Sequence, residues 1–344
     1  MNKEKYMQRC IQIASNGKLY AAPNPLVGAV IVHKNKIIGE GFHIKSGQAH
    51  AEVNAINSVK DKQLLAESTI FVSLEPCSHV GKTPPCADLI IKNKIPHVII
   101  GCQDPFSKVA GNGIKKLKEA GILVEVGILE EECLQLIHRF HTFHKYKRPY
   151  IILKWAQSAD AFIDKKRTKG SPFILSSPLS SLLTHKRRAE VSSILVGTNT
   201  AKLDNPSLTV RHWYGNNPVR LVIDKDLKLT KDLKLLDNTQ ETLIFTSKKN
   251  IVEKENIKYI SINFNINIIP QILATLYEKN IQSVLVEGGS KLHQSFIQQN
   301  LWDEIYIEQT PHILGSGIKA AQISCEYKFI EEVTLGRRYH IYMK

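Results

Sequence analysis

One histidine, two cysteines and one acidic residue restrict the fold of this 344-residue chain more than any other feature. His50 and Glu52 belong to the segment His-Ala-Glu, and Cys77 and Cys86 enclose the segment Ser-His-Val-Gly-Lys-Thr-Pro-Pro. Histidine and cysteine are common zinc ligands, and three protein ligands leave the fourth tetrahedral position open to solvent. We therefore predict that His50, Cys77 and Cys86 converge on one zinc ion, which requires the two segments to meet in space.

Glu52 is the candidate catalytic residue beside this metal site. Zinc lowers the pKa of bound water, and a nearby carboxylate can then move protons. His50 opens a helical pattern, in which residues two positions apart point about 200° away from each other. In the first turn of a helix both side chains can still border one cavity. His-x-Glu followed by Pro-Cys and a second cysteine is the signature of zinc-dependent nucleobase deaminases. Glu75 and His79 are candidates for supporting the ligands.

Alternating strand and helix patterns surround these residues and predict a layered α/β domain with a largely parallel sheet. Strands are expected at 27–32, 36–41, 69–74, 97–102 and 123–126, and helices at 4–15, 50–59, 87–92, 113–120 and 130–141. Asn24 lies between two prolines that fix the backbone on either side of it. Its amide could meet the edge of a heterocycle, although an ordinary loop ahead of a strand is the alternative.

The length suggests two domains, and we place the boundary at about residue 147, giving domains 1–147 and 148–344. The net charge of +14 is spread over both halves instead of forming a tail or stripe, so we expect no nucleic-acid partner. No apolar run reaches the ~18 residues of a membrane span, and no secretory signal is evident. The six cysteines do not suggest a disulfide framework. We expect a cytoplasmic homo-oligomer that acts on a small molecule.

The second half repeats the α/β pattern and contains two segments that suggest chemistry. Gly288, Gly289 and Ser290 link a strand to a helix start, where free backbone N–H groups can hold phosphate, although a simple tight turn is an equal alternative. Thr200 and Asp204 could bind ribose or amide groups, and Arg211 a phosphate, although a polar surface loop is the alternative. Strands are expected at 150–156, 192–197, 219–224, 242–245, 259–262, 283–287 and 304–309, and helices at 177–190, 269–279 and 290–299.

Together these residues resemble the bifunctional riboflavin-biosynthesis family, in which a pyrimidine deaminase is fused to a pyrimidine reductase. Residues 23–28, 50–52 and 76–86 look like its deaminase half, and the long proline-rich spacing between the two cysteines is the most specific feature. Residues 204–211 and 286–289 are similar to its reductase half. The resemblance implies a cytidine-deaminase-like α/β/α domain with zinc, followed by a dihydrofolate-reductase-like α/β domain that uses NADPH.

The resemblance also implies two reactions on one pyrimidine ribosyl phosphate. Water replaces the 2-amino group of the diaminopyrimidinone, with Glu52 carrying the proton to the departing ammonia, and NADPH then reduces the ribosyl side chain to ribityl. The residues implied for NADPH are Lys154, Gln157, Thr200, Asp204, Gly288, Gly289 and Ser290. Those implied for substrate are Asn24, Arg188, Leu208, Arg211 and Glu287, with the arginines holding its phosphate.

Two positions depart from the family pattern, both in the second half. Ala161 follows Asp160 where the family usually has glycine, and Pro172 stands beside Ser171 where a substrate-contacting serine is expected. Two alternatives remain. A tRNA or nucleoside deaminase with an accessory domain should have the short Cys-x-x-Cys spacing. An RNA-binding or regulatory protein with a non-catalytic second half should gain no thermal stability from NADPH.

Overall fold

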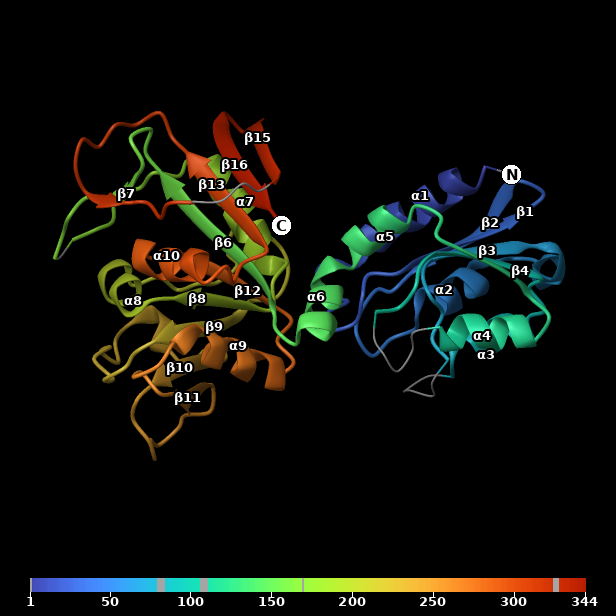
Figure 1. The fold of residues 1–344 in the computed structure, drawn as a ribbon, viewed down its shortest axis with the longest axis horizontal. Helices are drawn as coiled ribbons and strands as arrows, with labels where there is room; N and C mark the ends of the chain where they lie inside the picture. Colours follow the sequence, from blue (N-terminus) through green and yellow to red (C-terminus); the bar gives the residue numbers. More distant parts are fainter. Residues whose placement is uncertain (1, 79–83, 106–110, 169, 324–327) are drawn as a thin grey trace. The chain divides into compact units, whose positions relative to one another are not determined.

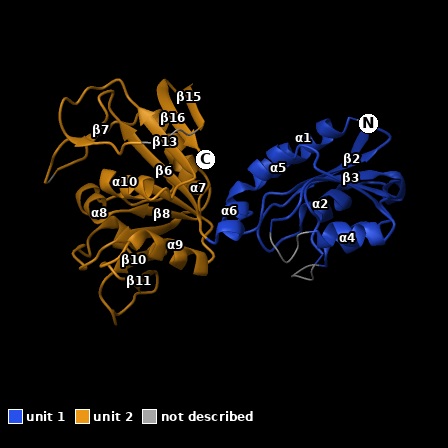
Figure 2. Ribbon diagram, in the orientation of Figure 1, with its two compact units in different colours: residues 1–147 blue, residues 148–344 orange. Residues whose placement is uncertain are grey.

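Four buried hydrophobic clusters form among the described residues, two around each of two large sheets, as a computed structural model shows (Figure 1). It describes residues 2–78, 84–105, 111–168, 170–323 and 328–344. The contacts between residues divide the chain into two compact units, Met1–Lys147 and Arg148–Lys344 (Figure 2). Every helix in the described ranges is too short or too polar to span a lipid bilayer.

The first unit contains a five-stranded sheet of order β2-β1-β3-β4-β5. Strand β1 pairs antiparallel with β2 and β3, whereas the pairs β3–β4 and β4–β5 are parallel. The expectation of a largely parallel sheet is therefore wrong for this unit. Lys34 and Asn35, both with positive φ, turn the chain directly from β1 into β2 and so make this pair antiparallel. The strands are β1 Gly28–His33, β2 Lys36–Phe42, β3 Thr69–Leu74, β4 His97–Cys102 and β5 Leu123–Val126.

Helices cover both faces of this sheet and make an α/β/α sandwich (Figure 1). Helices α1 and α5 pack on one face, where Cys102 and Cys133 are buried as expected, and α2, α3 and α4 pack on the other. The single helix expected at 130–141 is instead two helices that meet at the buried Ile137. The helices are α1 Lys3–Ala14, α2 Ala51–Ser58, α3 Cys86–Lys92, α4 Asn112–Glu119, α5 Glu130–Leu136 and α6 His138–Tyr146.

The second unit contains a nine-stranded sheet of order β11-β10-β9-β8-β12-β6-β13-β16-β15. All pairs from β11 to β13 are parallel, and β16 and β15 extend the sheet antiparallel at one edge. The seven strands expected from the sequence all form, whereas β15 and β16 were not expected. The strands are β6 Tyr150–Gln157, β8 Ser193–Val196, β9 Val219–Ile223, β10 Thr242–Thr246, β11 Ile257–Ser261, β12 Ser283–Gly288, β13 Glu304–Gln309, β15 Lys328–Thr334 and β16 Arg337–Met343.

Helices α9 and α10 cover one face of this sheet, and α8 covers the other. Thr200 and Asp204 lie in helix α8, whereas a polar surface loop was the alternative for their segment. A small sheet of β7 and β14 lies apart from the main one. The remaining elements are α7 Pro178–Ala189, α8 Thr198–Asp204, α9 Ile268–Glu278, α10 Ser290–Gln298, β7 Phe162–Asp164 and β14 Ile318–Lys319.

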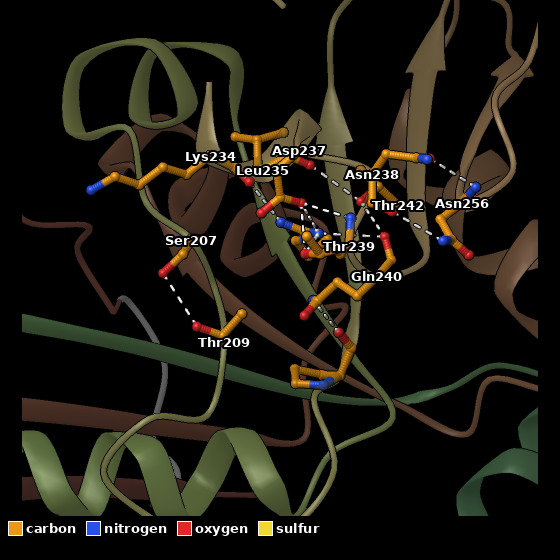
Figure 3. A network of polar contacts seen from close by, with 12 residues as sticks. Ser207, Thr209, Lys234, Leu235, Asp237, Asn238, Thr239, Gln240, Thr242 and Asn256 are labelled. Atoms are coloured by element: carbon orange, nitrogen blue, oxygen red, sulfur yellow. Dashed lines mark hydrogen bonds and ion pairs between the residues drawn. The ribbon is translucent and has the colours of Figure 1, made fainter. Parts of the chain in front are cut away.

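A buried arginine ties the segment after β9 to the sheet. Arg220 is fully buried in β9, donates to the Lys234 carbonyl at 2.8 Å and pairs with Asp237 at 2.7 Å. Asp237 also accepts hydrogen bonds from the backbone and hydroxyl of Thr239 (Figure 3). A buried guanidinium needs such partners because an unpaired charge in the interior is very costly. This network therefore holds the segment after β9 against the sheet.

Candidate functional site

The three residues predicted to bind zinc meet at the ends of three different elements. His50 immediately precedes α2, Cys77 follows β3, and Cys86 is the first residue of α3. Their ligand atoms all lie within 4.8 Å of one another, and Nδ1 of His50 is 3.6 Å from Cys77 Sγ and 3.3 Å from Cys86 Sγ. Tetrahedral zinc with ordinary bond lengths places nitrogen and sulfur ligands about 3.5 Å apart. The three side chains therefore fit a shared zinc ion.

The surroundings of Cys77 favour its thiolate, which is the metal-binding form of cysteine. The backbone N–H of Cys86 donates to Cys77 Sγ at 3.3 Å. The Cys86 thiol and the His50 imidazole hold the pKa of Cys77 well below its usual range. The donor set of one imidazole and two thiols is typical of zinc, since softer sulfur ligands select against magnesium and calcium.

Glu52 lies in the first turn of α2 and is only 3% exposed. Burial raises the pKa of Glu52 to about 7, and the nearby Cys77 adds to this effect. A carboxyl group whose pKa lies near the working pH can both accept and donate a proton. Glu52, the second residue of α2, thus lies close enough to His50, Cys77 and Cys86 to interact electrostatically with all three. His79, a predicted supporting residue, lies outside the described residues.

A buried histidine that the sequence analysis did not single out holds the amide of Asn24. His43 Nδ1 lies 3.1 Å from the Ala49 carbonyl, so this nitrogen carries the proton and Nε2 is an acceptor. The Asn24 amide then donates to His43 Nε2 at 3.0 Å, which directs its nitrogen toward the histidine. His43 also packs edge-on against His50. No motif marks His43, because its role depends on a contact between residues far apart in the sequence.

The second unit contains a cavity of about 970 Å³ at the carboxyl ends of β6, β8 and β12. Ligands of parallel α/β sheets commonly bind at this edge. The predicted residues that line it are Lys154, Thr200, Asp204, Gly288, Gly289, Ser290, Arg188, Leu208 and Glu287. Gln157 and Arg211 are not among the described residues that line it. Gln157 accepts a hydrogen bond from Trp155 Nε1 at 2.8 Å, and the exposed Arg211 donates to Ser207 and Thr209, which Figure 3 shows beside each other.

The turn between β12 and α10 brings bare backbone to the edge of this cavity. Gly288 has a φ of +132°, a conformation that side chains rarely tolerate. A Cβ added at Gly289 would lie 3.3 Å from the hydroxyl oxygen of Thr200. Ser290 then begins α10, so the positive end of a helix dipole lies at the cavity. These features suit a bound phosphate group.

Three ion pairs hold charged residues of the cavity in place. Arg188 binds Glu287 through two hydrogen bonds of 2.6 and 2.8 Å, and both side chains are about nine-tenths buried. Burial lowers the pKa of Lys154, against the opposing effect of Glu287. Arg167, which was not predicted, pairs with Asp204 and lies 2.7 Å from Asp164. Its only signal in the sequence is its place in a short basic cluster.

Ala161 and Pro172, the two residues that depart from the family pattern, both lie in the described part of the second unit. Ala161 has a φ of +62°, so alanine occupies the left-handed conformation that glycine would adopt without strain. Its backbone N–H still donates to the Ser158 carbonyl at 3.0 Å, which keeps the turn closed. Pro172 lines the cavity, whereas Ser171 is not among the described lining residues.

The fold and the two sites define an enzyme with a cytidine-deaminase-like domain followed by a dihydrofolate-reductase-like domain, which confirms the predicted fold class. Residues 1–102 match the cytidine and deoxycytidylate deaminase zinc-binding region, and residues 149–336 match the RibD C-terminal domain. The chain belongs to the RibD family of riboflavin biosynthesis proteins. The alternative of a nucleoside deaminase with an accessory domain is therefore not favoured.

Relatives and a solved structure cover almost the whole chain. Riboflavin biosynthesis protein RibD of Aquifex aeolicus (strain VF5) is 38% identical over 93% of this chain and 90% of its own length. The protein of the same name from Bacillus amyloliquefaciens is 39% identical over 94% and 88%. The crystal structure of a diaminohydroxyphosphoribosylaminopyrimidine deaminase/5-amino-6-(5-phosphoribosylamino)uracil reductase from Thermotoga maritima has a TM-score of 0.89 and 35% identity, covering 99% of this chain and 98% of that one.

Proposed function

We propose that this protein deaminates a diaminopyrimidinone ribosyl phosphate in its first domain and reduces the ribosyl side chain of the product in its second. The first domain is Met1–Lys147 and the second Arg148–Lys344. The observation that carries the proposal is the convergence of His50, Cys77 and Cys86 beside the buried Glu52. The cavity of the second domain, with its glycine turn, supports the reductive step.

In the deaminase domain, a zinc ion held by His50, Cys77 and Cys86 would supply a Lewis acid that makes water nucleophilic near neutral pH. Glu52 takes up a proton at its carboxylate and delivers it to the amino group that leaves as ammonia. Its raised pKa supports both steps, because each form is populated near pH 7. One N–H of the Asn24 amide donates to His43, and the amide oxygen, which this bond leaves free, binds the pyrimidine. That oxygen accepts a hydrogen bond and so selects an N–H edge.

In the reductase domain, NADPH would supply a hydride to C1′ of the opened ribose. Gly288, Gly289 and Ser290 bind its phosphates through backbone N–H groups at the start of α10. The cofactor site in this proposal also includes Lys154, Thr200 and Asp204, which line the cavity. Gln157, the fourth residue proposed for it, is not among the described lining residues.

The substrate of the reductase domain occupies the same cavity in this proposal. Arg188, Leu208 and Glu287 line it, and Arg211 extends from the neighbouring segment to the substrate phosphate. Arg188 then shares its charge between Glu287 and that phosphate. We also propose that the protein acts in the cytoplasm as a homo-oligomer, which cell fractionation and sedimentation equilibrium would test.

A coupled assay on the full-length protein with zinc, NADPH and the diaminopyrimidinone ribosyl phosphate tests the proposal. We expect ammonia release followed by NADPH oxidation. Glu52→Gln should abolish ammonia release while zinc remains bound and the deaminated intermediate is still reduced. Glu67→Gln, at an exposed glutamate of the same domain, is the matched control and should behave as wild type. Ammonia release by the Glu52→Gln protein, or no NADPH oxidation by the wild type, would contradict the proposal.

A further inference from the structure

Glu75 is a buried carboxylate that links the end of β3 to the start of α4. It is the first residue after β3 and is 3% exposed. One carboxylate oxygen accepts hydrogen bonds from the backbone N–H groups of Gly113 and Ile114, at 2.9 and 3.2 Å. The other accepts from those of Gly111 and Asp104, at 2.9 and 3.3 Å. These bonds occupy the acceptor sites that a carboxylate offers.

Pro76 and Cys77, the two residues that follow Glu75, contact the starts of two helices. A Cβ added at Gly113 would lie 2.0 Å from the carbonyl oxygen of Pro76, so the start of α4 packs directly on this peptide. On the other side, the Ala87 N–H at the start of α3 donates to the Cys77 carbonyl at 3.1 Å. Cys77 itself belongs to no helix or strand. Its position is therefore set by these contacts and not by a regular element.

We propose that Glu75 is a positioning residue for the metal ligand Cys77, an inference that rests on the zinc site of the proposed function. Only Pro76 separates the two residues, and its ring restricts the backbone between them. Glu75 fixes one end of this short connection against α4 through four N–H groups. Loss of these bonds lets the connection move and widens the distance from Cys77 to the other two ligands.

A glutamate at the start of a helix can also act as a simple cap, and zinc affinity separates the two roles. A cap contributes stability with or without metal, because it satisfies N–H groups and the helix dipole. A positioning residue changes how well the three ligands fit one ion. Loss of groups that orient metal ligands typically lowers metal affinity by about 10–100-fold.

The experiment measures the zinc dissociation constant of the full-length protein by competition with a chelator. Glu75→Gln keeps the size of the side chain but replaces one acceptor oxygen with a donor, and we expect zinc affinity to fall by at least about tenfold. Glu119→Gln is the matched control, because this exposed residue ends the same helix and its carboxylate pairs with Lys115 at 3.8 Å. It should bind zinc as wild type does. Glu75→Asp, which keeps the charge on a shorter side chain, should give an intermediate affinity.

Thermal unfolding of the metal-free proteins completes the test. If Glu75→Gln binds zinc as tightly as the wild type, the inference is overturned and Glu75 is only a helix cap, whether or not the metal-free variant melts at a lower temperature. If Glu75→Gln does not fold, Glu75→Asp decides in the same way. A wild-type protein that binds no zinc would instead overturn the proposed function. NADPH oxidation with the deaminated intermediate should be unchanged in all variants, since the second domain is untouched.

Discussion

Replacing Glu287 by glutamine removes the counter-ion of a buried arginine in the second domain. Arg188 and Glu287 are joined by two hydrogen bonds, and their side chains are 11% and 12% exposed. Glu287 also acts on Lys154, where it opposes the lowering of the pKa by burial. The glutamine variant would therefore remove the charge that pairs with Arg188 and that raises the pKa of Lys154.

Breaking a buried ion pair from one side typically costs about 3–5 kcal/mol. In a domain of about 200 residues, each kcal/mol lowers Tm by about 2–4 °C, so we expect a fall of roughly 10 °C. Glu253→Gln removes one partner of an exposed pair in the same domain, in which Lys258 lies 3.1 Å away and the side chains are 40% and 43% exposed. That control should leave the unfolding midpoint close to that of the wild type, because exposed ion pairs contribute little to stability.

Urea unfolding followed by tryptophan fluorescence isolates this effect, because all three tryptophans, at 155, 213 and 302, lie in the second domain. We expect a lower midpoint for Glu287→Gln at an unchanged slope. The double variant Arg188→Met with Glu287→Leu should recover most of the loss, since apolar pairs can replace buried ion pairs. A cost below about 1 kcal/mol for Glu287→Gln would refute the reasoning.

Three further predictions concern single side chains. Burial lowers the pKa of His293 to about 4, so between pH 6.5 and 4 the unfolded chain binds a proton that the folded chain does not. The free energy of unfolding should therefore fall by up to about 3 kcal/mol as the pH falls through this range. His293→Gln should make the fall of the urea midpoint with pH shallower, and an equally steep fall would contradict the prediction. Ala161→Gly should relieve left-handed strain and stabilise the second domain by about 1 kcal/mol or less, and a lower Tm would argue against strain. His43→Phe should raise the KM of deamination about tenfold at unchanged zinc content, because Asn24 loses its partner; an unchanged KM would remove Asn24 from the substrate site.

The convergence of His50, Cys77 and Cys86, with Glu52 in the first turn of α2, could be predicted because each of these residues lies in a short motif at the end of an element. The spacing of His50 and Glu52, and the proline-rich stretch before Cys86, are visible in a single sequence. Strands such as β3 and β13 were predicted with their observed bounds. Strand β3 is a run of apolar and β-branched residues, and β13 has buried isoleucines at the alternate positions 305 and 307.

Other features depend on contacts between distant residues and leave no local pattern. His43 acts on Asn24, and Arg167 on Asp204, across separations that periodicity does not reveal. Strands β15 and β16 were missed because their charged residues, such as Glu331 and Arg338, interrupt the hydrophobic alternation at an exposed sheet edge. The break at Ile137 was missed because the helical pattern continues across it.

Metal analysis of the purified full-length protein tests the central claim most directly. If His50, Cys77 and Cys86 share one ion, the wild-type protein should contain about one zinc per chain, and Cys86→Ser should lose it while still oxidising NADPH with the deaminated intermediate. A folded wild-type protein without zinc, or a Cys86→Ser protein that keeps its full zinc content, would contradict the account.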